Sequence, residues 1–318
     1  MPFDYSNMNL LPKLCVVNSR SECDTSTRFG KYKFSLPVVP ANMECVINIE
    51  IAKKLAKNNY FYIMHRFNVD VVSFCKEMIS NNYYTSISIG VNGDSYMDID
   101  KLKLNNINPD YITIDIAHGH CLKMKNIITY VKENLPNTFI IAGNVSTRDA
   151  VIDLEDWGAN AIKVGIGPGS ACTTYNATGF GSRGIQASII RDCSSVAARA
   201  AIIADGGVTY PGDIAKSLVL GASMVMIGGM FSGLTDSPGN EVQGTDGQMY
   251  KEFWGSASAH QSNKKNRIEG TKKLIPMKQH NILQEMTYIE ECLQSAVSYG
   301  GGVNLDCLES VNYIIKNV

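Results

Sequence analysis

Residues 202–231 read IIADGGVTYPGDIAKSLVLGASMVMIGGMF, a stretch that joins two apolar runs, AAIIADGG from Ala200 and SMVMIGG from Ser223. Each run is apolar at successive positions, which is typical of a strand covered on both faces in a parallel sheet. The two runs begin roughly 25 residues apart, the usual length of a βα unit. The stretch therefore predicts two parallel strands, each ending in a glycine pair, with a helix between them.

Six further runs of the same kind occur earlier in the chain. They are LPVVPAN from Leu36, YFYIMH from Tyr60, TSISIG from Thr85, YITIDIAHG from Tyr111, TFIIAGN from Thr138 and NAIKVGIG from Asn160. Segments with helical spacing separate them, such as Ile127, Ile128 and Val131 before Pro136. Eight βα units predict an α/β fold, a closed (β/α)8 TIM barrel. The alternative is an open doubly wound sheet, which the absence of G-x-G-x-x-G after the first strand disfavours.

The composition indicates a soluble globular protein, because 45% of the 318 residues are hydrophobic and 19% are charged. The formal net charge of -1 disfavours a broad basic surface for nucleic acid or an anionic membrane. The nine cysteines never form C-x-x-C, which disfavours a disulfide framework or a zinc ribbon and favours reduced thiols in the cytoplasm. The start MPFDYSNMNLLPK does not resemble a secretory leader, and no apolar run is long enough to span a membrane.

Two connections are longer than a barrel requires, and both follow the carboxyl end of a strand. The first contains CTTYNATGFGSRG and gives a cysteine loop at about residues 165–185. The second, at about residues 235–280, precedes the helical segment NILQEMTYIEECLQSAV and is expected to form a flap. Long loops at this end of a TIM barrel usually carry function. We expect residues 1–318 to form one catalytic domain.

The glycine pairs after the last two strands predict a phosphate site. In TIM barrels these two loops commonly hold a phosphate with backbone N–H groups, and a Cβ there would keep the phosphate away. The pairs are Gly206 with Gly207 and Gly228 with Gly229. Asp205 precedes the first pair, where it suits a ribose diol. The alternatives are glycines that only turn the chain and an ordinary turn or helix-capping aspartate.

Cys172 lies in the stretch GIGPGSACTT, at the barrel mouth and near the predicted phosphate site. Its thiol is placed to reach a base or sugar held by that phosphate. The glycines also free backbone carbonyls, so Gly167, Gly169 and Cys172 suit a monovalent cation site. The alternative for Cys172 is a buried, inert thiol, the usual state of a free cysteine. For the other eight cysteines the inert state is the expectation.

Motifs along almost the whole chain resemble the IMP dehydrogenase/GMP reductase family. They are FDYSNMNLLP, SRSECDTS, PVVPANM, IDIAHGH, IAGNVST, GIGPGSACTT, YKEFWGSAS and the stretch 202–231, and they occur in the family's order. The fold that this resemblance implies is a TIM barrel.

Within the family, the chain resembles the GMP reductase branch of the short bacterial type. IMP dehydrogenases usually carry a pair of nucleotide-binding modules after the second strand, whereas YFYIMHRFNVDVVSFCKEM runs directly from strand to helix. They also carry an Arg-Tyr pair on the flap. The flap here reads KKNRIEGTKK, with Glu269 before glycine and no Arg-Tyr pair. NRIEGTKK differs from the RASEGK-like sequence of animal reductases, which affects the expected cofactor contacts more than the nucleophile.

The resemblance implies NADPH-dependent reductive deamination of GMP to IMP and ammonia, through a covalent thioimidate, in purine salvage. It implies that Cys172 is the nucleophile and that Thr174 and Glu269 relay protons to the leaving ammonia. It also implies a potassium ion and a homotetramer, with no nucleic-acid or membrane partner.

The remaining family roles carry over by position. Asp205, Gly206, Gly207, Gly228 and Gly229 match the ribose and phosphate site, and Gly255, Ser256 and Ala257 match the backbone that meets the purine. Asp115 and Asn144 match residues near the nicotinamide. Either His65 or Arg66 matches a functional position, and the sequence leaves that choice open. His118 and His120 are spaced like a metal pair, but the resemblance disfavours a metal there.

Three alternative functions stay open at this point: an IMP dehydrogenase, a non-catalytic purine-nucleotide-binding regulator, and a flavin-dependent barrel sharing the phosphate loops.

Overall fold

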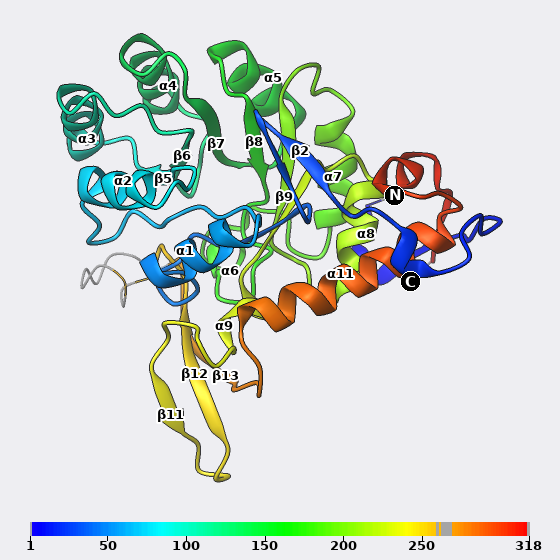
Figure 1. Ribbon diagram of the computed structural model, residues 1–318. Helices are drawn as coiled ribbons and strands as arrows, with labels where there is room; N and C mark the ends of the chain where they lie inside the picture. The colour runs from blue at the N-terminus through cyan, green and yellow to red at the C-terminus, as the bar shows by residue number, and fades with distance from the viewer. Residues whose placement is uncertain (1, 259–260, 262–268, 317–318) are drawn as a thin grey trace.

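Seven parallel strands curl into a barrel in the computed structural model, which describes residues 2–258, 261 and 269–316 (Figure 1). Neighbouring strands follow the order β4-β10-β9-β8-β7-β6-β5. The strands are β4 (Val38–Pro40), β5 (Ser86–Ile89), β6 (Tyr111–Asp115), β7 (Phe139–Val145), β8 (Ala161–Val164), β9 (Ala201–Asp205) and β10 (Met224–Ile227). β10 pairs in parallel with β9, as the opening stretch predicts, and also with β4. The prediction of an α/β, TIM-barrel-like fold is confirmed.

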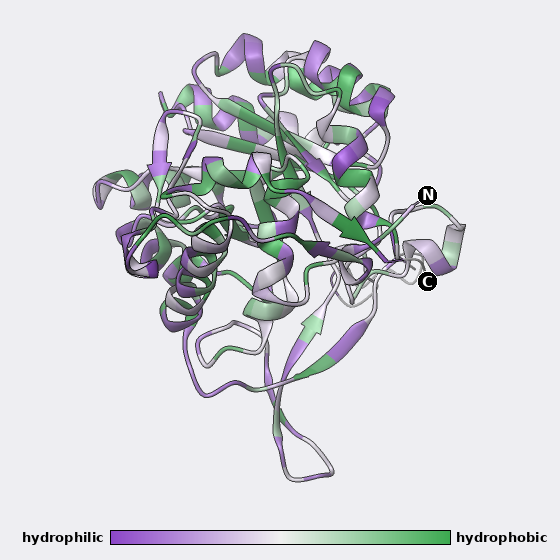
Figure 2. Ribbon diagram, turned by 90° about the vertical axis from the view of Figure 1, so that its right-hand side faces the viewer, coloured by the Kyte–Doolittle hydropathy of each residue, from purple (hydrophilic) through white to green (hydrophobic). Residues whose placement is uncertain are grey.

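Helices cover the outside of the barrel. The longer ones are α1 (Ile49–Lys57), α2 (Val71–Ser80), α3 (Gly93–Leu104), α4 (Leu122–Asn134), α5 (Arg148–Trp157), α7 (Gln186–Ser194), α8 (Pro211–Val219) and α11 (Ile282–Tyr299). Several begin at a side chain that accepts a helix N–H bond, as Asn48 does for α1 and Thr147 for α5. Figure 2 shows hydrophobic residues concentrated on the central strands and hydrophilic ones on the outer helices. Only residues 66–70 separate the segment 60–65 from α2, so no second module is inserted there.

The prediction of a strand from Tyr60 is wrong, because this segment lacks the regular backbone hydrogen bonds of a strand. Residues 60–65 are not assigned to a strand, although the backbone N–H of Met64 donates to the carbonyl of Ser86 in β5. Hydrogen bonds of two tyrosine hydroxyls take the place of the backbone hydrogen bonds that a strand would make here. The Tyr84 hydroxyl accepts from the Tyr62 N–H at 3.0 Å and donates to the Tyr60 carbonyl. The Tyr62 hydroxyl donates to the Tyr84 carbonyl at 2.8 Å and accepts from the Ser86 N–H.

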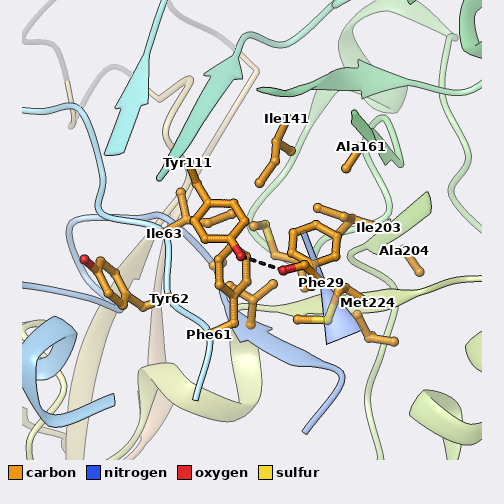
Figure 3. Close-up of a cluster of buried hydrophobic side chains, with 14 of the residues drawn as sticks. Phe29, Phe61, Tyr62, Ile63, Tyr111, Ile141, Ala161, Ile203, Ala204 and Met224 are labelled. Atoms are coloured by element: carbon orange, nitrogen blue, oxygen red, sulfur yellow. Dashed lines mark hydrogen bonds between the residues drawn. The ribbon is translucent and has the colours of Figure 1, made fainter. Parts of the chain in front are cut away.

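A hairpin near the N-terminus closes the end of the barrel opposite the long loops. It consists of β2 (Thr27–Phe29) and β3 (Tyr32–Phe34). The Phe29 ring packs against Phe61, Tyr111 and Phe139, with centroid distances of 5.0 to 5.9 Å. The Tyr111 hydroxyl donates to the Phe29 carbonyl (Figure 3). Because Tyr111 and Phe139 are the first residues of β6 and β7, this aromatic cluster fills the amino-terminal end of the barrel.

The flap segment contains strands that the sequence analysis did not anticipate. β11 (Glu241–Gln243), β12 (Met249–Trp254) and β13 (Lys272–Pro276) form an antiparallel sheet that projects from the barrel below α1 and α9 in Figure 1. The short helix α9 (Gly229–Ser232) follows β10, and α6 (Thr174–Thr178) lies within the cysteine loop. A further pair, β1 (Met8–Leu10) with β14 (Tyr313–Ile315), joins the two ends of the chain.

Within the described residues, no helix combines the length and apolar character that crossing a membrane requires.

Replacing Tyr62 by phenylalanine tests the tyrosine hydrogen bonds that hold the segment 60–65. The substitution removes one oxygen and leaves the buried Ser86 N–H and Tyr84 carbonyl without that partner. We expect the free energy of unfolding, measured by urea denaturation, to fall by about 1–3 kcal/mol. The matched control is Tyr299→Phe, whose side chain is 67% exposed and which should change the value by less than about 0.5 kcal/mol. Equal effects of the two substitutions would contradict the structural role of the Tyr62 hydroxyl.

Candidate active site

A cavity of about 770 Å³ opens at the carboxyl ends of the barrel strands. Its volume falls within the range of small-molecule sites, roughly 300–1,000 Å³. Every residue to which the sequence analysis assigns a role without an alternative residue lines this cavity. They are Asp115, Asn144, Gly167, Gly169, Cys172, Thr174, Asp205, Gly206, Gly207, Gly228, Gly229, Gly255, Ser256, Ala257 and Glu269. The structure thus brings these residues together, and the role of each stays a prediction.

A chain of hydrogen bonds links Cys172, Thr174 and Glu269. The Cys172 Sγ lies 3.1 Å from the Thr174 Oγ1, which donates to the Glu269 Oε2 at 2.8 Å. A threonine hydroxyl has a single proton, and here that proton is directed at the carboxylate. The thiol is therefore the donor in its bond to Thr174. The arrangement can carry a proton from the thiol to the carboxylate through one hydroxyl.

Backbone bonds dock the flap segment onto the cysteine loop. The Thr173 N–H donates to the Glu269 carbonyl at 3.1 Å, and the Thr271 N–H donates to the Ala171 carbonyl at 2.9 Å. Gly255 of the flap segment lies against the cysteine loop, where an added Cβ would lie 3.2 Å from the Ala171 carbonyl oxygen. This close approach explains why a glycine suits position 255. The hydrogen-bonded chain of Cys172, Thr174 and Glu269 thus depends on the docking of two loops.

The glycine pair after β9 has the backbone conformation that favours glycine, with φ of +84° at Gly206 and +80° at Gly207. The Gly206 N–H, however, already donates to the Met226 carbonyl at 3.3 Å. Gly206 therefore provides a turn of the chain, and its N–H is not left over for a phosphate. At Gly229 a Cβ would meet nothing within 4 Å, so the backbone there faces open space.

The sequence analysis missed Lys163, which lies on β8 at the floor of the cavity. Its side chain is 2% exposed, and its Nζ lies 2.8 Å from Asp115 Oδ1 and 3.2 Å from Asp205 Oδ2. Asn144 also donates to Asp205 Oδ2, at 2.7 Å. A signal was present, because a lysine interrupts the apolar run NAIKVGIG. A charge in a strand covered on both faces requires an opposite charge nearby.

Charge pairing, not burial, decides the ionisation of Asp115 and Lys163. Burial alone would raise the pKa of the Asp115 carboxyl, but Lys163, Arg66 and the Asn42 amide together hold that pKa below its ordinary value. Burial alone would lower the pKa of Lys163, but Asp115 and Asp205 raise it above its ordinary value. Both groups are therefore charged at neutral pH.

Of the two residues left open by the sequence, Arg66 lines the cavity and His65 does not. His65 is buried, and its Nδ1 accepts the Phe67 N–H at 3.2 Å. Burial lowers the pKa of His65, so its ring is neutral at pH 7. The Nε atom of Arg66 is buried and has no hydrogen-bond partner among the described residues. The position that faces the site is therefore Arg66.

The cysteine loop, where the monovalent cation site is predicted, offers backbone oxygens but no cluster of acidic side chains. Gly167 has a φ of +76°, and the Gly169 carbonyl accepts the Cys172 N–H at 3.0 Å. Among the described residues, no group of three histidine, cysteine or acidic side chains is arranged to hold a metal ion. His120, one of the two spaced histidines, pairs with Asp153 at 2.7 Å. A cation in this loop would therefore depend on backbone carbonyls.

The nine thiols should differ sharply in reactivity. Burial raises the pKa of Cys45, Cys75 and Cys193 to about 12, so only about one thiol in ten thousand is ionised at pH 8. Cys15 is exposed, and hydrogen bonding from Ser298 lowers its pKa.

We expect iodoacetamide at about pH 8 to label Cys15 and the cavity residue Cys172, and to leave the three buried thiols unmodified, as read by peptide mass spectrometry. The same reaction in urea is the control and should label all nine. Labelling of Cys45 at the rate of Cys15 in the folded protein would contradict this assignment.

Comparison with known proteins agrees with the motifs. A family model described as the IMP dehydrogenase/GMP reductase domain matches residues 2–316. A GMP reductase from Mycoplasma mycoides subsp. mycoides is 50% identical over 98% of this chain and 97% of its own length. A GMP reductase from Acidovorax sp. (strain JS42) is also 50% identical, and one from Bacillus cereus (strain ATCC 10987) is 48% identical; each match covers 98% of this chain and 95% of the relative. With a cavity lined by the predicted residues and relatives matched from end to end, this chain belongs to the IMP dehydrogenase/GMP reductase family.

Proposed function

We propose that this protein is a GMP reductase, which converts GMP, NADPH and a proton into IMP, ammonia and NADP+ in purine salvage. The observation that carries the proposal is the hydrogen-bonded chain from the Cys172 thiol through Thr174 to Glu269, inside the large cavity. The three similar proteins described above are named GMP reductase, which supports the proposal.

The first half of the reaction replaces the amino group of GMP by sulfur. The Cys172 thiol passes its proton to Thr174 as Thr174 passes its own to Glu269, and the sulfur bonds to C2 of the purine. Glu269 then returns the proton through Thr174 to the exocyclic amine, which leaves as ammonia. The carbon–nitrogen bond breaks and a thioimidate remains on Cys172. In the second half, C2 gains a hydride and the carbon–sulfur bond breaks, giving IMP.

The residues around the cavity fit a nucleotide. Asp205 at the end of β9 is held by Asn144 and Lys163, so its carboxylate is oriented to accept a ribose hydroxyl. Gly207, Gly228 and Gly229 supply backbone near the phosphate, while Gly206 sets the turn. Gly255, Ser256 and Ala257 stand beside the cysteine loop and would meet the purine.

The cavity also extends to residues that such a nucleotide would not cover. Arg66, Gly90, Val91, Asn92 and Asp115 line this part. The room and the charged groups fit NADPH, and Asp115 and Asn144 would hold its nicotinamide end. When bound, NADPH supplies the hydride that C2 receives. The residues here bind the cofactor, orient it and exclude water.

We further propose a potassium ion held by the backbone carbonyls of Gly167, Gly169 and Cys172, since carbonyl oxygens suit a hard monovalent cation. We also propose that residues 1–318 act as one catalytic domain in the cytoplasm. The nine free cysteines support this compartment, because thiols stay reduced there. A homotetramer is also proposed, because the resemblance to the family implies one.

Replacing Cys172 by alanine tests the nucleophile. We expect GMP-dependent oxidation of NADPH, followed by absorbance, to fall by at least about a thousandfold, because no bond to C2 can form. The affinity for GMP, measured by calorimetry, should stay within about tenfold of wild type. Cys15→Ala is the matched control and should keep full activity. Retained turnover in Cys172→Ala would reject the mechanism, and formation of xanthosine monophosphate from IMP and NAD+ by the wild type would assign an IMP dehydrogenase instead.

Replacing Glu269 by glutamine separates the two half-reactions. The amide cannot take up and return the proton, so ammonia release from GMP should slow by about a hundredfold or more. Single-turnover formation of NADPH from IMP and NADP+ loses only the proton acceptor for the thiol and needs no proton for a leaving amine, so it should slow less than ammonia release. The control is Glu241→Gln, a half-exposed carboxylate on β11 outside the cavity. Equal losses in both half-reactions of Glu269→Gln would be inconsistent with a role in ammonia release.

A further inference from the structure

The floor of the cavity holds a buried lysine between two carboxylates that belong to different parts of the proposed site. The Nζ of Lys163 contacts Asp115 at 2.8 Å and Asp205 at 3.2 Å, and its side chain is 2% exposed. Asp115 lies on the side proposed for the cofactor, and Asp205 on the side proposed for the ribose. Lys163 is therefore the group that the two sides share.

The surrounding chain is built to keep this lysine in place. A Cβ at position 143 on the neighbouring strand β7 would lie 2.5 Å from the Lys163 Cβ, so Gly143 makes room for the side chain. Asn42 donates to the second oxygen of Asp115 at 3.0 Å. Asn144 donates to Asp205 at 2.7 Å and to the Gly165 carbonyl at 2.7 Å. These amides leave the carboxylates little freedom to turn.

The charge balance depends on Lys163. One ammonium faces two carboxylates, and the other cation acting on Asp115 is Arg66 at the rim of the cavity. Two half-buried carboxylates that lose the cation between them repel each other, so the pair takes up a proton more readily. Without Lys163, a proton would therefore occupy the pair at neutral pH for part of the time. A protonated Asp205 is a poorer acceptor for a ribose hydroxyl.

We propose that Lys163 is a positioning residue that balances the charges of Asp115 and Asp205 and keeps both carboxylates directed into the cavity, so that nucleotide affinity is independent of pH near neutrality. The inference rests on the proposed function, because it takes Asp205 as the ribose ligand. Lys163 itself acts through the two carboxylates and not on the reacting atoms.

The test compares Lys163→Met, Lys163→Arg and the double variant Asp115→Asn/Lys163→Met with wild type, all as the full chain. The affinity for GMP is measured by calorimetry at about pH 6 and about pH 8. Wild type and Lys163→Arg should bind GMP equally at both values. Lys163→Met should bind about tenfold more weakly at the lower pH and recover as the pH rises. The double variant has only one carboxylate to ionise and should again bind independently of pH, with affinity near wild type.

A second readout needs no nucleotide. In Lys163→Met the folded state is expected to hold one proton on the carboxylate pair that the unfolded chain has already released, so stability is lost as the pH rises through the range where that proton leaves. Between about pH 6 and about pH 8 its Tm should fall by about 2 °C relative to wild type. If wild type fails to bind GMP, the proposed function is wrong while this comparison still tests the charge balance.

Three results would overturn the inference. One is a folded Lys163→Met protein that binds GMP with wild-type affinity at both pH values. Another is a double variant that folds but has lost GMP binding. The third is a double variant that does not fold, because Lys163 would then be needed for something other than balancing the second carboxylate. If Lys163→Met alone fails to fold, the double variant decides.

Discussion

Parallel strands in a barrel direct all their carboxyl ends to one rim, and polar groups that meet there below the surface must satisfy one another. Asp115, Asn144, Lys163 and Asp205 come from four adjacent strands, β6 to β9, and pair through short contacts. Breaking such a buried pair typically costs about 3–5 kcal/mol, so the arrangement is strongly held. It forms a rigid floor, and the loops that carry the proposed chemistry stand on it.

The loops above this floor are held by a different kind of interaction. The cysteine loop and the flap meet through backbone bonds between Ala171 and Thr271 and between Thr173 and Glu269, and glycines allow the close approach. The opposite end of the barrel is filled by the aromatic cluster around Phe29, which leaves the cavity end to the polar residues. Stability and chemistry are thus concentrated at opposite ends, as is usual for barrels of this kind.

Much of this structure could be predicted from the sequence, and the exceptions have physical causes. Buried parallel strands are continuously apolar, so seven of the eight predicted runs became strands of the barrel. The run from Tyr60 did not, because the Tyr62 and Tyr84 hydroxyls take hydrogen bonds that a ladder would make, and side-chain competition of this kind leaves no trace in a hydropathy pattern. β13 (KKLIP) is largely exposed, and its two apolar residues, Leu274 and Ile275, are too short a run to predict a strand.

The site was predictable to a similar degree. Glycine pairs and polar residues at strand ends located the cavity lining without the structure, because barrels place such residues at one rim. The resemblance to a known family, not the spacing, pointed to Glu269, since a flap residue far along the chain has no local pattern. Lys163 was missed because a single lysine in an apolar run is ambiguous until its two acidic partners are seen around it.

The contact between Thr174 and Glu269 joins positions 95 residues apart. Glu269 therefore reaches the thiol only through tertiary structure, whereas Asp205 and the glycine turns are anchored at the ends of barrel strands. In the proposed mechanism, substitutions that loosen the contact between the two loops would slow turnover more than they weaken recognition of the ribose and phosphate. Speed and affinity then become separately adjustable properties of one protein, each open to selection in its own part of the chain.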